Sequence, residues 1–98
     1  MGAKLLVRQR VEVGESAFAE LVVWELPQPL LGSQHKFKYR LAYVVLGACV
    51  LRYDNEAGKG DHRHWGREEI SYRFTSPTQL MADFFEDIQR YNHDHADD

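Results

Sequence analysis

The side chains best suited to chemistry are concentrated in the thirteen residues from Tyr53 to Trp65. This segment combines two histidines, His62 and His64, with two aspartates, a lysine, an arginine and closely spaced glycines. Histidine exchanges protons near neutral pH, cationic side chains neutralise phosphate, and glycine lets the backbone approach a ligand closely. If the chain catalyses a reaction, we expect it to do so in this segment.

The first interpretation of the segment is a metal-independent site for RNA cleavage. Cleavage needs a base for the 2′-hydroxyl group, an acid for the leaving oxygen and cations for the charge that develops on the phosphate. One histidine would act as acid or base and the other would position the substrate. Lys59 and Arg63 would stabilise the phosphate, while Asp61 would orient a histidine or hold the loop. Gly58 and Gly60 would offer backbone N–H groups to the same anion. The candidate catalytic residues are His62, His64, Lys59, Arg63 and Asp61.

Two other interpretations stay open. If the segment forms a strand, the two histidines share one face and can chelate a metal ion from it. The candidate metal ligands are Asp54, Asp61, His62 and His64. The helical two-histidine and paired-cysteine motifs that identify zinc sites do not occur in the sequence. Alternatively, the segment is a solvated hairpin loop without chemistry. The residues expected to serve the structure of the loop are Asp54, Asn55, Gly58 and Gly60.

Charge is segregated along the chain, although the net charge is only −3. Residues 35–67 carry seven basic and three acidic side chains, whereas residues 68–98 carry two basic and eight acidic ones. A basic region of this kind suits contact with an anion such as RNA. Trp65, beside Arg63, is placed to stack an unpaired base, whereas Trp24 is interpreted as a core or rim residue. The predicted nucleic-acid-binding residues are Lys36, Lys38, Arg40, Arg52, Arg67 and Trp65.

The length of 98 residues predicts a single domain over residues 1–92, followed by an acidic flexible tail over residues 93–98. No stretch is long and apolar enough to span a membrane and no signal-peptide pattern is present, so we expect a cytoplasmic protein. Cys49 lies in an apolar run and is expected to be a buried, unreactive thiol. No cofactor is expected, and His35 is assigned no role.

The residue patterns predict an α+β domain, a mostly antiparallel sheet of about five to six strands packed by one C-terminal helix. Ser76, Pro77 and Gln79 are typical of a capped helix start, and apolar residues then recur at helical spacing. Strands are expected over residues 4–13, 18–26, 36–45, 49–54, 62–65 and 69–75.

The hairpin around Gly47 has two registers between which the sequence does not choose. With a two-residue loop, Tyr39 shares a face with Asp54. With a bulged loop, Lys38 and Arg40 share that face instead. The register therefore decides whether basic side chains line the same surface as the start of the chemical segment.

Several motifs resemble those of the TumE family, the toxins of bacterial and archaeal toxin–antitoxin pairs. The central motif is Gly-Lys-Gly-Asp-His-Arg-His from Gly58 to His64, and similar runs precede it at residues 38–45 and 50–56. The likeness covers most of the chain and extends to residues 24–27, 67–69, 72–74 and 79–84. The turn at residues 45–47 departs from the pattern because it lacks Asn-Gly, and Trp65 stands where an aliphatic residue is more usual.

The resemblance implies a growth-inhibiting toxin that a cognate antitoxin, often a DNA-binding protein, holds inactive. The matching motif positions are Asp54, Asn55, Lys59, Gly60, Asp61, His62, Arg63 and His64. Many compact toxins are ribonucleases with an antiparallel sheet, so analogy favours RNA, free or on the ribosome, as the substrate. Whether the chain is an enzyme stays open. The alternatives are a non-catalytic module that binds nucleic acid or the antitoxin, and a metal-dependent nuclease.

Overall fold

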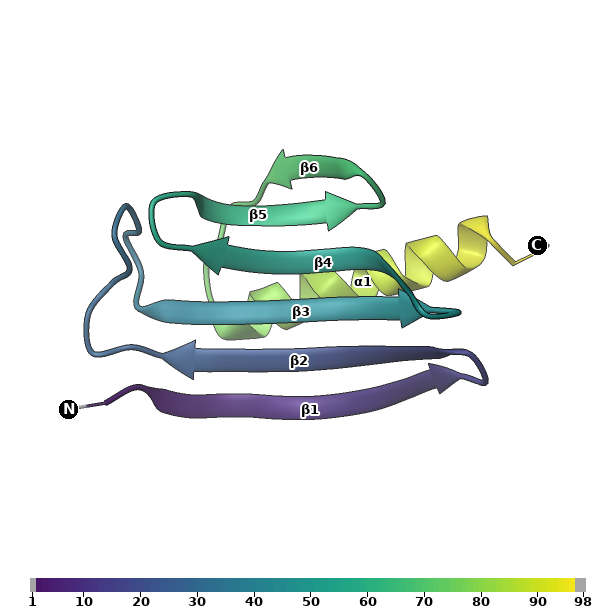
Figure 1. The fold of residues 1–98 in the computed structure, drawn as a ribbon, viewed down its shortest axis with the longest axis horizontal. Helices are drawn as coiled ribbons and strands as arrows, with labels where there is room; N and C mark the ends of the chain where they lie inside the picture. The colour runs from purple at the N-terminus through teal and green to yellow at the C-terminus, as the bar shows by residue number, and fades with distance from the viewer. Residues whose placement is uncertain (1, 97–98) are drawn as a thin grey trace.

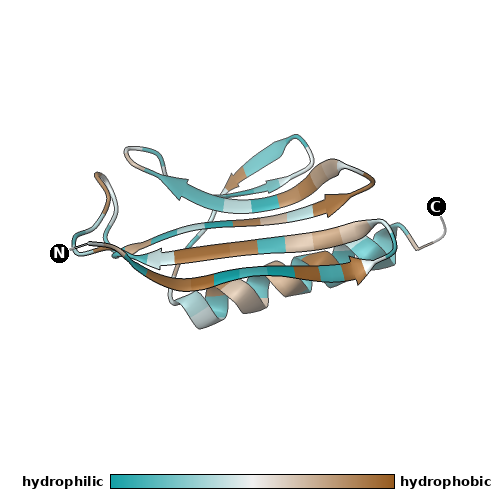
Figure 2. Ribbon diagram, turned by 60° about the horizontal axis from the view of Figure 1, so that its bottom comes forward, coloured by the Kyte–Doolittle hydropathy of each residue, from teal (hydrophilic) through white to brown (hydrophobic). Residues whose placement is uncertain are grey.

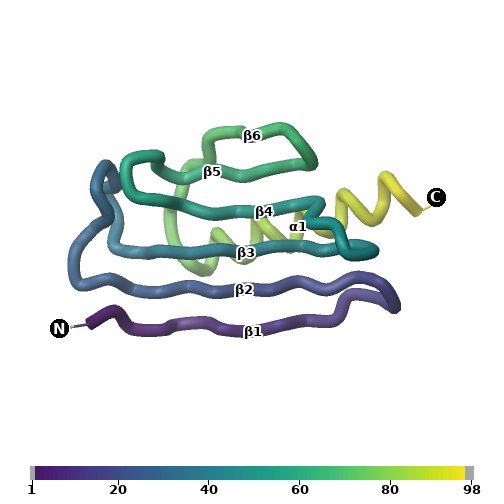
Figure 3. The backbone as a smooth tube through the Cα atoms, in the orientation of Figure 1, coloured from purple at the N-terminus to yellow at the C-terminus, as the bar shows by residue number. Residues whose placement is uncertain are grey.

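The computed structural model describes residues 2–96, which form a six-stranded antiparallel sheet and one helix (Figure 1). Consecutive strands are hydrogen-bonded neighbours throughout, so the sheet is a meander with β1 and β6 at its edges (Figure 3). The elements are β1 Lys4–Gly14, β2 Ala17–Glu25, β3 Phe37–Val45, β4 Ala48–Glu56, β5 Gly60–Trp65, β6 Glu68–Ser71 and α1 Pro77–Asp94. The predicted α+β class, with a C-terminal helix on a mostly antiparallel sheet, is confirmed.

Helix α1 begins where the sequence predicts. Ser76 is the N-cap and its Oγ accepts a hydrogen bond of 3.1 Å from the backbone N–H of Gln79, while Pro77 occupies the first helical position. The side chain of Gln79 donates 2.7 Å to Asp83 Oδ1, one turn ahead, instead of taking the backward role expected in a capping box. The cap therefore fixes the start of α1 through the serine.

Helix α1 lies against one face of the sheet and leaves the opposite face uncovered (Figure 2). We call these the covered face and the open face. Because side chains alternate along a strand, β3 and β4 send apolar and aromatic residues to the covered face and polar ones to the open face. The fully buried large side chains of this core are Tyr43, Tyr53, Phe84, Leu21, Leu41, Leu51, Leu80 and Val23.

The hairpin between β3 and β4 takes the bulged register. Its two turn residues, Leu46 and Gly47, both have positive φ angles, of 52° and 80°. A register shift next to the turn leaves Val50 without a direct partner, so Arg40 pairs with Asp54. Basic side chains of β3 therefore share the open face with Asp54.

Three local expectations differ from the structure. Cys49 is exposed, so the prediction of a buried thiol is wrong; it pairs with Val44 on the uncovered side of the sheet. The last strand ends at Ser71, not at residue 75. Helix α1 continues to Asp94, inside the predicted tail of residues 93–98, whose last two residues lie outside the described part of the chain. Within residues 2–96, no helix has the length and apolar character needed to cross a bilayer.

Candidate active site on the open face

Two rows of paired residues cross the open face from β3 to β6. In the first row Arg40 pairs with Asp54, and Asp54 pairs with His62. In the second row Arg52 pairs with His64, which pairs with Glu69. Directly opposed residues of an antiparallel pair have Cβ atoms about 4.5–5.5 Å apart, so each row places its side chains in contact range. The register therefore brings both histidines of the central motif beside cationic and acidic groups.

Arg52, Asp54 and His64 form the centre of this arrangement. Arg52 Nη2 lies 3.2 Å from His64 Nε2, and since a guanidinium only donates, the imidazole nitrogen accepts. Arg52 Nε lies 3.1 Å from Asp54 Oδ2, an ion pair that lacks hydrogen-bond geometry. His64 Nε2 is also 3.6 Å from Asp54 Oδ1. His64 Nε2 is thus the hydrogen-bond acceptor at the centre of the group.

A small pocket of about 100 Å³ opens above these groups, and we call it the histidine pocket. His62 Nε2 lies 3.6 Å from Glu69 Oε1 on one side of it. The exposed Lys59 stands at the rim, 3.8 Å from Glu56 Oε2. Pockets that enclose a drug-sized ligand measure about 300–1,000 Å³, so a nucleotide would lie across this pocket and present only a small group to it. The lining residues are Arg52, Asp54, Glu56, Lys59, His62, His64 and Glu69.

The charge of the histidine pocket depends on its histidines. Arg52 and Lys59 supply two fixed positive charges against three carboxylates, so the lining is acidic when both histidines are neutral and basic when both are protonated. Arg40, paired with Asp54, adds a further cation at the border. A phosphate therefore gains most from this pocket when the histidines carry protons.

Arg63, a predicted catalytic residue, lies on the covered face, because strand alternation sends it away from His62 and His64. Its Nη1 is 3.3 Å from Asp87 Oδ2 and 3.5 Å from the hydroxyl of Tyr53. The hydrogen bond with Tyr53 is the main reason that the pKa of Arg63 is raised. The structure therefore does not bring Arg63 together with the two histidines, and its contacts tie β5 to α1.

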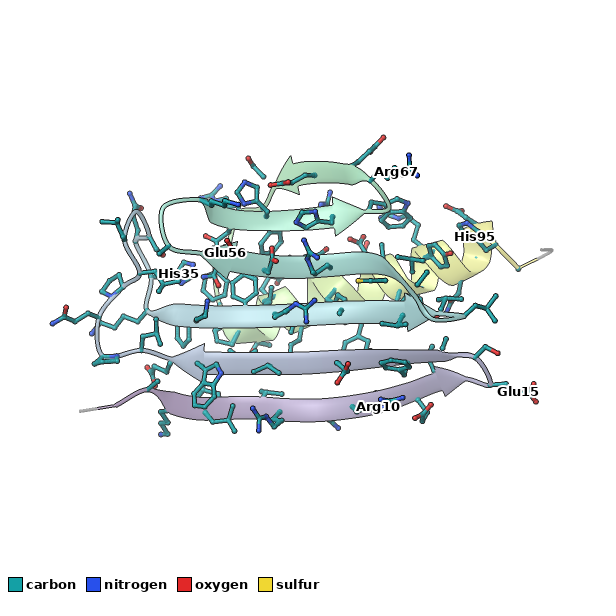
Figure 4. The ribbon with its side chains drawn as sticks, viewed as in Figure 1. Arg10, Glu15, His35, Glu56, Arg67 and His95 are labelled. Atoms are coloured by element: carbon teal, nitrogen blue, oxygen red, sulfur yellow. The ribbon has the colours of Figure 1, made fainter. Side chains whose placement is uncertain are left out.

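Asp61, also predicted to be catalytic, lies on the covered face as well. Its carboxylate accepts hydrogen bonds from Tyr39 Oη at 2.6 Å and from His35 Nε2 at 2.9 Å. His35 Nδ1 accepts from the backbone N–H of Phe37 at 3.1 Å, so the ring proton is on Nε2. Burial and the Asp61 hydrogen bond raise the pKa of Tyr39 strongly. Asp61 does orient a histidine, but that histidine is His35, in the loop before β3 (Figure 4).

The motif residues Asn55 and Gly58 make contacts that shape the backbone. Asn55 is only 3% exposed; its Oδ1 accepts from the N–H of Tyr39 at 3.0 Å and its Nδ2 donates to the carbonyl of Phe37 at 2.7 Å. The N–H of Gly58 donates to the carbonyl of Leu31 at 2.7 Å, and so is engaged within the protein. Gly58 and Gly60 have φ angles near +80°, which glycine adopts without strain.

The four candidate metal ligands do not meet. Asp54, His62 and His64 face the open side, whereas Asp61 points to the covered side. Within residues 2–96, no group of three or more His, Cys, Asp or Glu side chains has a metal-binding arrangement. Strand alternation separates Asp61 from its neighbour His62 and so from the other three candidates.

The predicted RNA-binding residues are divided between the two faces. Lys38, Arg40 and Arg52 lie on the open face through the register of β2, β3 and β4. Trp65 lies on the covered face, where its ring centroid is 6.2 Å from that of Tyr91. The two remaining basic residues are at the ends of strands: Lys36 precedes β3, and Arg67 is in the turn between β5 and β6 (Figure 4).

Sequence reasoning missed a second polar cluster on the covered face. Asp87 is 4% exposed and accepts 2.6 Å from Tyr53 Oη, and Asp83 accepts 2.6 Å from Tyr72 Oη. Burial, together with the Asp87 hydrogen bond, raises the pKa of Tyr53. Burial and the hydrogen bond to Asp83 raise the pKa of Tyr72 in the same way. The available signal was that Asp83 and Asp87 are four residues apart and flank Phe84 on the apolar side of α1.

The model of a family described as "Toxin TumE" matches residues 3–92, which is most of the chain. No curated protein and no solved structure matches. The motif that carries the family resemblance is also the one that supplies His62 and His64 to the histidine pocket. The chain therefore belongs to the TumE family of toxins.

Proposed function

We propose that this toxin is an endoribonuclease that cleaves RNA in the histidine pocket without a metal ion. The observation that supports this proposal is the convergence of Arg52, His62 and His64 on one uncovered sheet face. The set provides two imidazoles, the side chain most used for proton transfer in catalysis, and a planar cation suited to a phosphate. An uncovered face also lets a long polymer reach the side chains, as an enclosed cavity would not.

The first step assigns the base to His64. Its Nε2 accepts a hydrogen bond from Arg52 and so has a free electron pair once Arg52 turns towards a phosphate. In the proposed step, this nitrogen takes the proton of the ribose 2′-hydroxyl and the 2′-oxygen attacks the adjacent phosphorus. Asp54, 3.6 Å from the same nitrogen, then stabilises the imidazolium that forms.

The second step assigns the acid to His62. The two histidines are two residues apart on β5, which separates their Cα atoms by about 7 Å and leaves room for a phosphate between the rings. His62 in its protonated form pairs with Glu69, 3.6 Å away, and would give its proton to the leaving 5′-oxygen. The products are a 2′,3′-cyclic phosphate and a free 5′-hydroxyl. Arg52 and Lys59 stabilise the charge on the phosphate in the transition state.

Membership of the toxin family implies an antitoxin partner, which we propose to be a DNA-binding protein. An RNA substrate, whether free or on the ribosome, further implies that the toxin acts in the cytoplasm. A partner that covered the open face would exclude RNA from the histidine pocket. Inhibition would then follow from occupancy of the face alone.

The test is cleavage of RNA by purified protein in the presence of a chelator, with analysis of the new RNA ends. We expect cyclic phosphate ends, and a rate lowered about 10²- to 10⁴-fold in His62→Ala and in His64→Ala. Arg73→Ala, an exposed arginine outside the pocket, is the matched control and should cleave normally. Loss of cleavage in the chelator would instead indicate a metal-dependent nuclease.

Expression in a bacterial host separates the remaining alternative. Growth arrest with fragmented RNA, abolished by either histidine substitution at equal protein level, supports the nuclease. Growth arrest with intact RNA in the wild type, retained in both histidine variants, would remove the nuclease and leave a binding module.

A further inference from the structure

The open face carries one aromatic side chain that the cleavage mechanism does not use. Trp24 in β2 pairs with Lys38 of β3 on one side and with Leu5 of β1 on the other. It is half-buried, and Lys38 is exposed. The chain has only two tryptophans, and the other one, Trp65, packs on the covered face near Tyr91. Trp24 is therefore the tryptophan that shares a surface with the histidine pocket.

Basic residues connect Trp24 with the histidine pocket. Arg40 lies beside Lys38 on the same side of β3, and it pairs with Val22 of β2 and with Asp54 of β4. Arg8 of β1 pairs with Val22 from the other side, so two arginines flank one apolar residue next to Trp24. Asp54 is the only carboxylate among these paired positions, and it forms an ion pair with Arg52. The paired positions between Trp24 and the pocket thus carry three cations and one carboxylate, with an aromatic ring at their end.

The other aromatic residue of β2 on this face is already covered. The guanidinium carbon of Arg10 lies 3.7 Å from the ring centroid of Phe18, a cation–π contact that occupies the ring. Among the described residues, no aromatic ring and no cation stacks on Trp24. Phe18 thus provides a comparison residue on the same strand and face.

We propose that Trp24 is a stacking site for an unpaired base, and that the substrate is single-stranded RNA running from Trp24 over Lys38 and Arg40 to the histidine pocket. The proposal rests on the proposed function and names its substrate class. Strands in a sheet are about 4.8 Å apart, so β2 and β5 are separated by about 14 Å, a span suited to a short run of nucleotides. A base can stack on a side chain only when it is released from a duplex.

Fluorescence tests the contact directly. A Trp65→Phe variant keeps Trp24 as its only tryptophan, and a Trp24→Phe variant keeps only Trp65. The probe is a single-stranded 2′-O-methyl RNA oligonucleotide, which lacks the attacking hydroxyl and stays intact. We expect the oligonucleotide to quench the tryptophan fluorescence of the Trp65→Phe variant saturably, and not to quench that of the Trp24→Phe variant. The polyanion heparin, at matched charge, should not quench. Equal quenching by heparin or by the same sequence in duplex form would overturn the proposal.

Binding measurements give the second criterion. Trp24→Ala and Trp24→Leu should each weaken binding of the oligonucleotide at least about fivefold, the loss expected for one stacked base. The leucine variant keeps an apolar side chain opposite Leu5 and guards against a folding defect. Phe18→Ala is the matched control and should bind normally. Unchanged affinity in folded Trp24→Leu would remove the stacking site.

The two proposals fail separately. With cleavable RNA, Trp24→Leu should raise KM and leave kcat within about twofold. Quenching and weaker binding without any cleavage by the wild type would remove the nuclease and keep the base-stacking site. Cleavage with a normal KM in Trp24→Leu would keep the nuclease and remove the stacking site. Quenching by an antitoxin but not by RNA would identify the face as a protein-docking surface and contradict the proposal.

Discussion

Arg63 and His64 are adjacent in the chain, but their side chains lie on opposite faces of the sheet. Arg63 Nη1 is 3.3 Å from Asp87 on α1, whereas His64 Nε2 is 3.2 Å from Arg52 on the open face. One motif therefore serves two purposes. Its alternate residues contact the helix on the covered side and place His62 and His64 on the other side.

Replacing Arg63 and Arg52 in turn should separate an effect on stability from an effect on RNA cleavage. Asp87 is buried, so Arg63→Ala removes a partner from a buried carboxylate and should lower the free energy of unfolding by about 2 kcal/mol. The cost stays below that of a fully buried pair because Arg63 is partly exposed and Asp87 keeps the Tyr53 hydroxyl. Urea unfolding measures the change.

Arg52→Ala is the matched comparison. Its side chain reaches Asp54 and His64 at the open face, where water can replace it, so the free energy of unfolding should change by less than about 1 kcal/mol. RNA cleavage should nevertheless fall about 10²-fold, because the phosphate loses its planar cation. The reverse pattern, with a stable Arg63→Ala that does not cleave and an active Arg52→Ala, would contradict the assignment of Arg63 to stability and Arg52 to cleavage.

A second prediction concerns the buried amide of Asn55. It replaces ladder hydrogen bonds between β3 and β4 by binding the N–H of Tyr39 and the carbonyl of Phe37. Asn55→Ala leaves both backbone groups without that partner and should lower the free energy of unfolding by about 2–3 kcal/mol. The control Asn92→Ala removes one contact, to the Tyr43 hydroxyl, near the exposed end of α1, and should cost about 1 kcal/mol or less. Equal costs in the two variants would contradict this role.

Much of the fold follows from local patterns in the sequence. Alternation in β3 and the Ser76–Pro77 cap predicted the strand and the start of α1, because each depends on neighbouring residues only. The same alternation rule also places Arg63 opposite to His62 and His64. For the strand expected over residues 62–65 the rule puts both histidines on one face, but Arg63 and Asp61 were assigned to the same site by residue type alone.

Other features depend on contacts between distant residues and could not be predicted locally. The bulge at Val50 shifts the pairing of β3 with β4 by one residue, and this shift puts Arg40 opposite Asp54. His35 had no visible partner in the sequence because Asp61 is 26 residues away. Trp24 was expected in the core or at its rim, but which face it occupies is decided by its register with Lys38.

The turn between β3 and β4 offers a stabilising substitution. Leu46 is 80% exposed and has a φ of 52°, a conformation that costs energy in a leucine and is favoured in asparagine. Leu46→Asn restores the Asn-Gly pair of a tight hairpin and should raise the free energy of unfolding by about 0.5–1 kcal/mol. Thermal unfolding measures it, and Leu31→Asn, at another exposed leucine in a loop, is the control that should change little. A lower Tm in Leu46→Asn would show that the leucine makes a contact that the turn needs.

The protein should lose stability in alkaline solution because of its buried tyrosines. Burial raises the pKa of Tyr39 above the ordinary value of 10.0, and the hydrogen bond to Asp61 adds to the effect. Between the unfolded and folded pKa values, the unfolded chain has lost the phenol proton while the folded chain keeps it. The unfolded state then binds fewer protons, so the free energy of unfolding falls as pH rises.

The change to make is Tyr39→Phe, followed by urea unfolding at several pH values from 8 to 11. Below pH 9 the tyrosine is protonated in both states, so the variant should differ from the wild type by a constant, the lost hydrogen bond to Asp61. Above about pH 10 the wild type should lose about 1.4 kcal/mol more per pH unit than the variant, and the two curves should converge. Curves that stay parallel up to pH 11 would show that the Tyr39 phenol ionises as readily in the folded protein as in the unfolded chain.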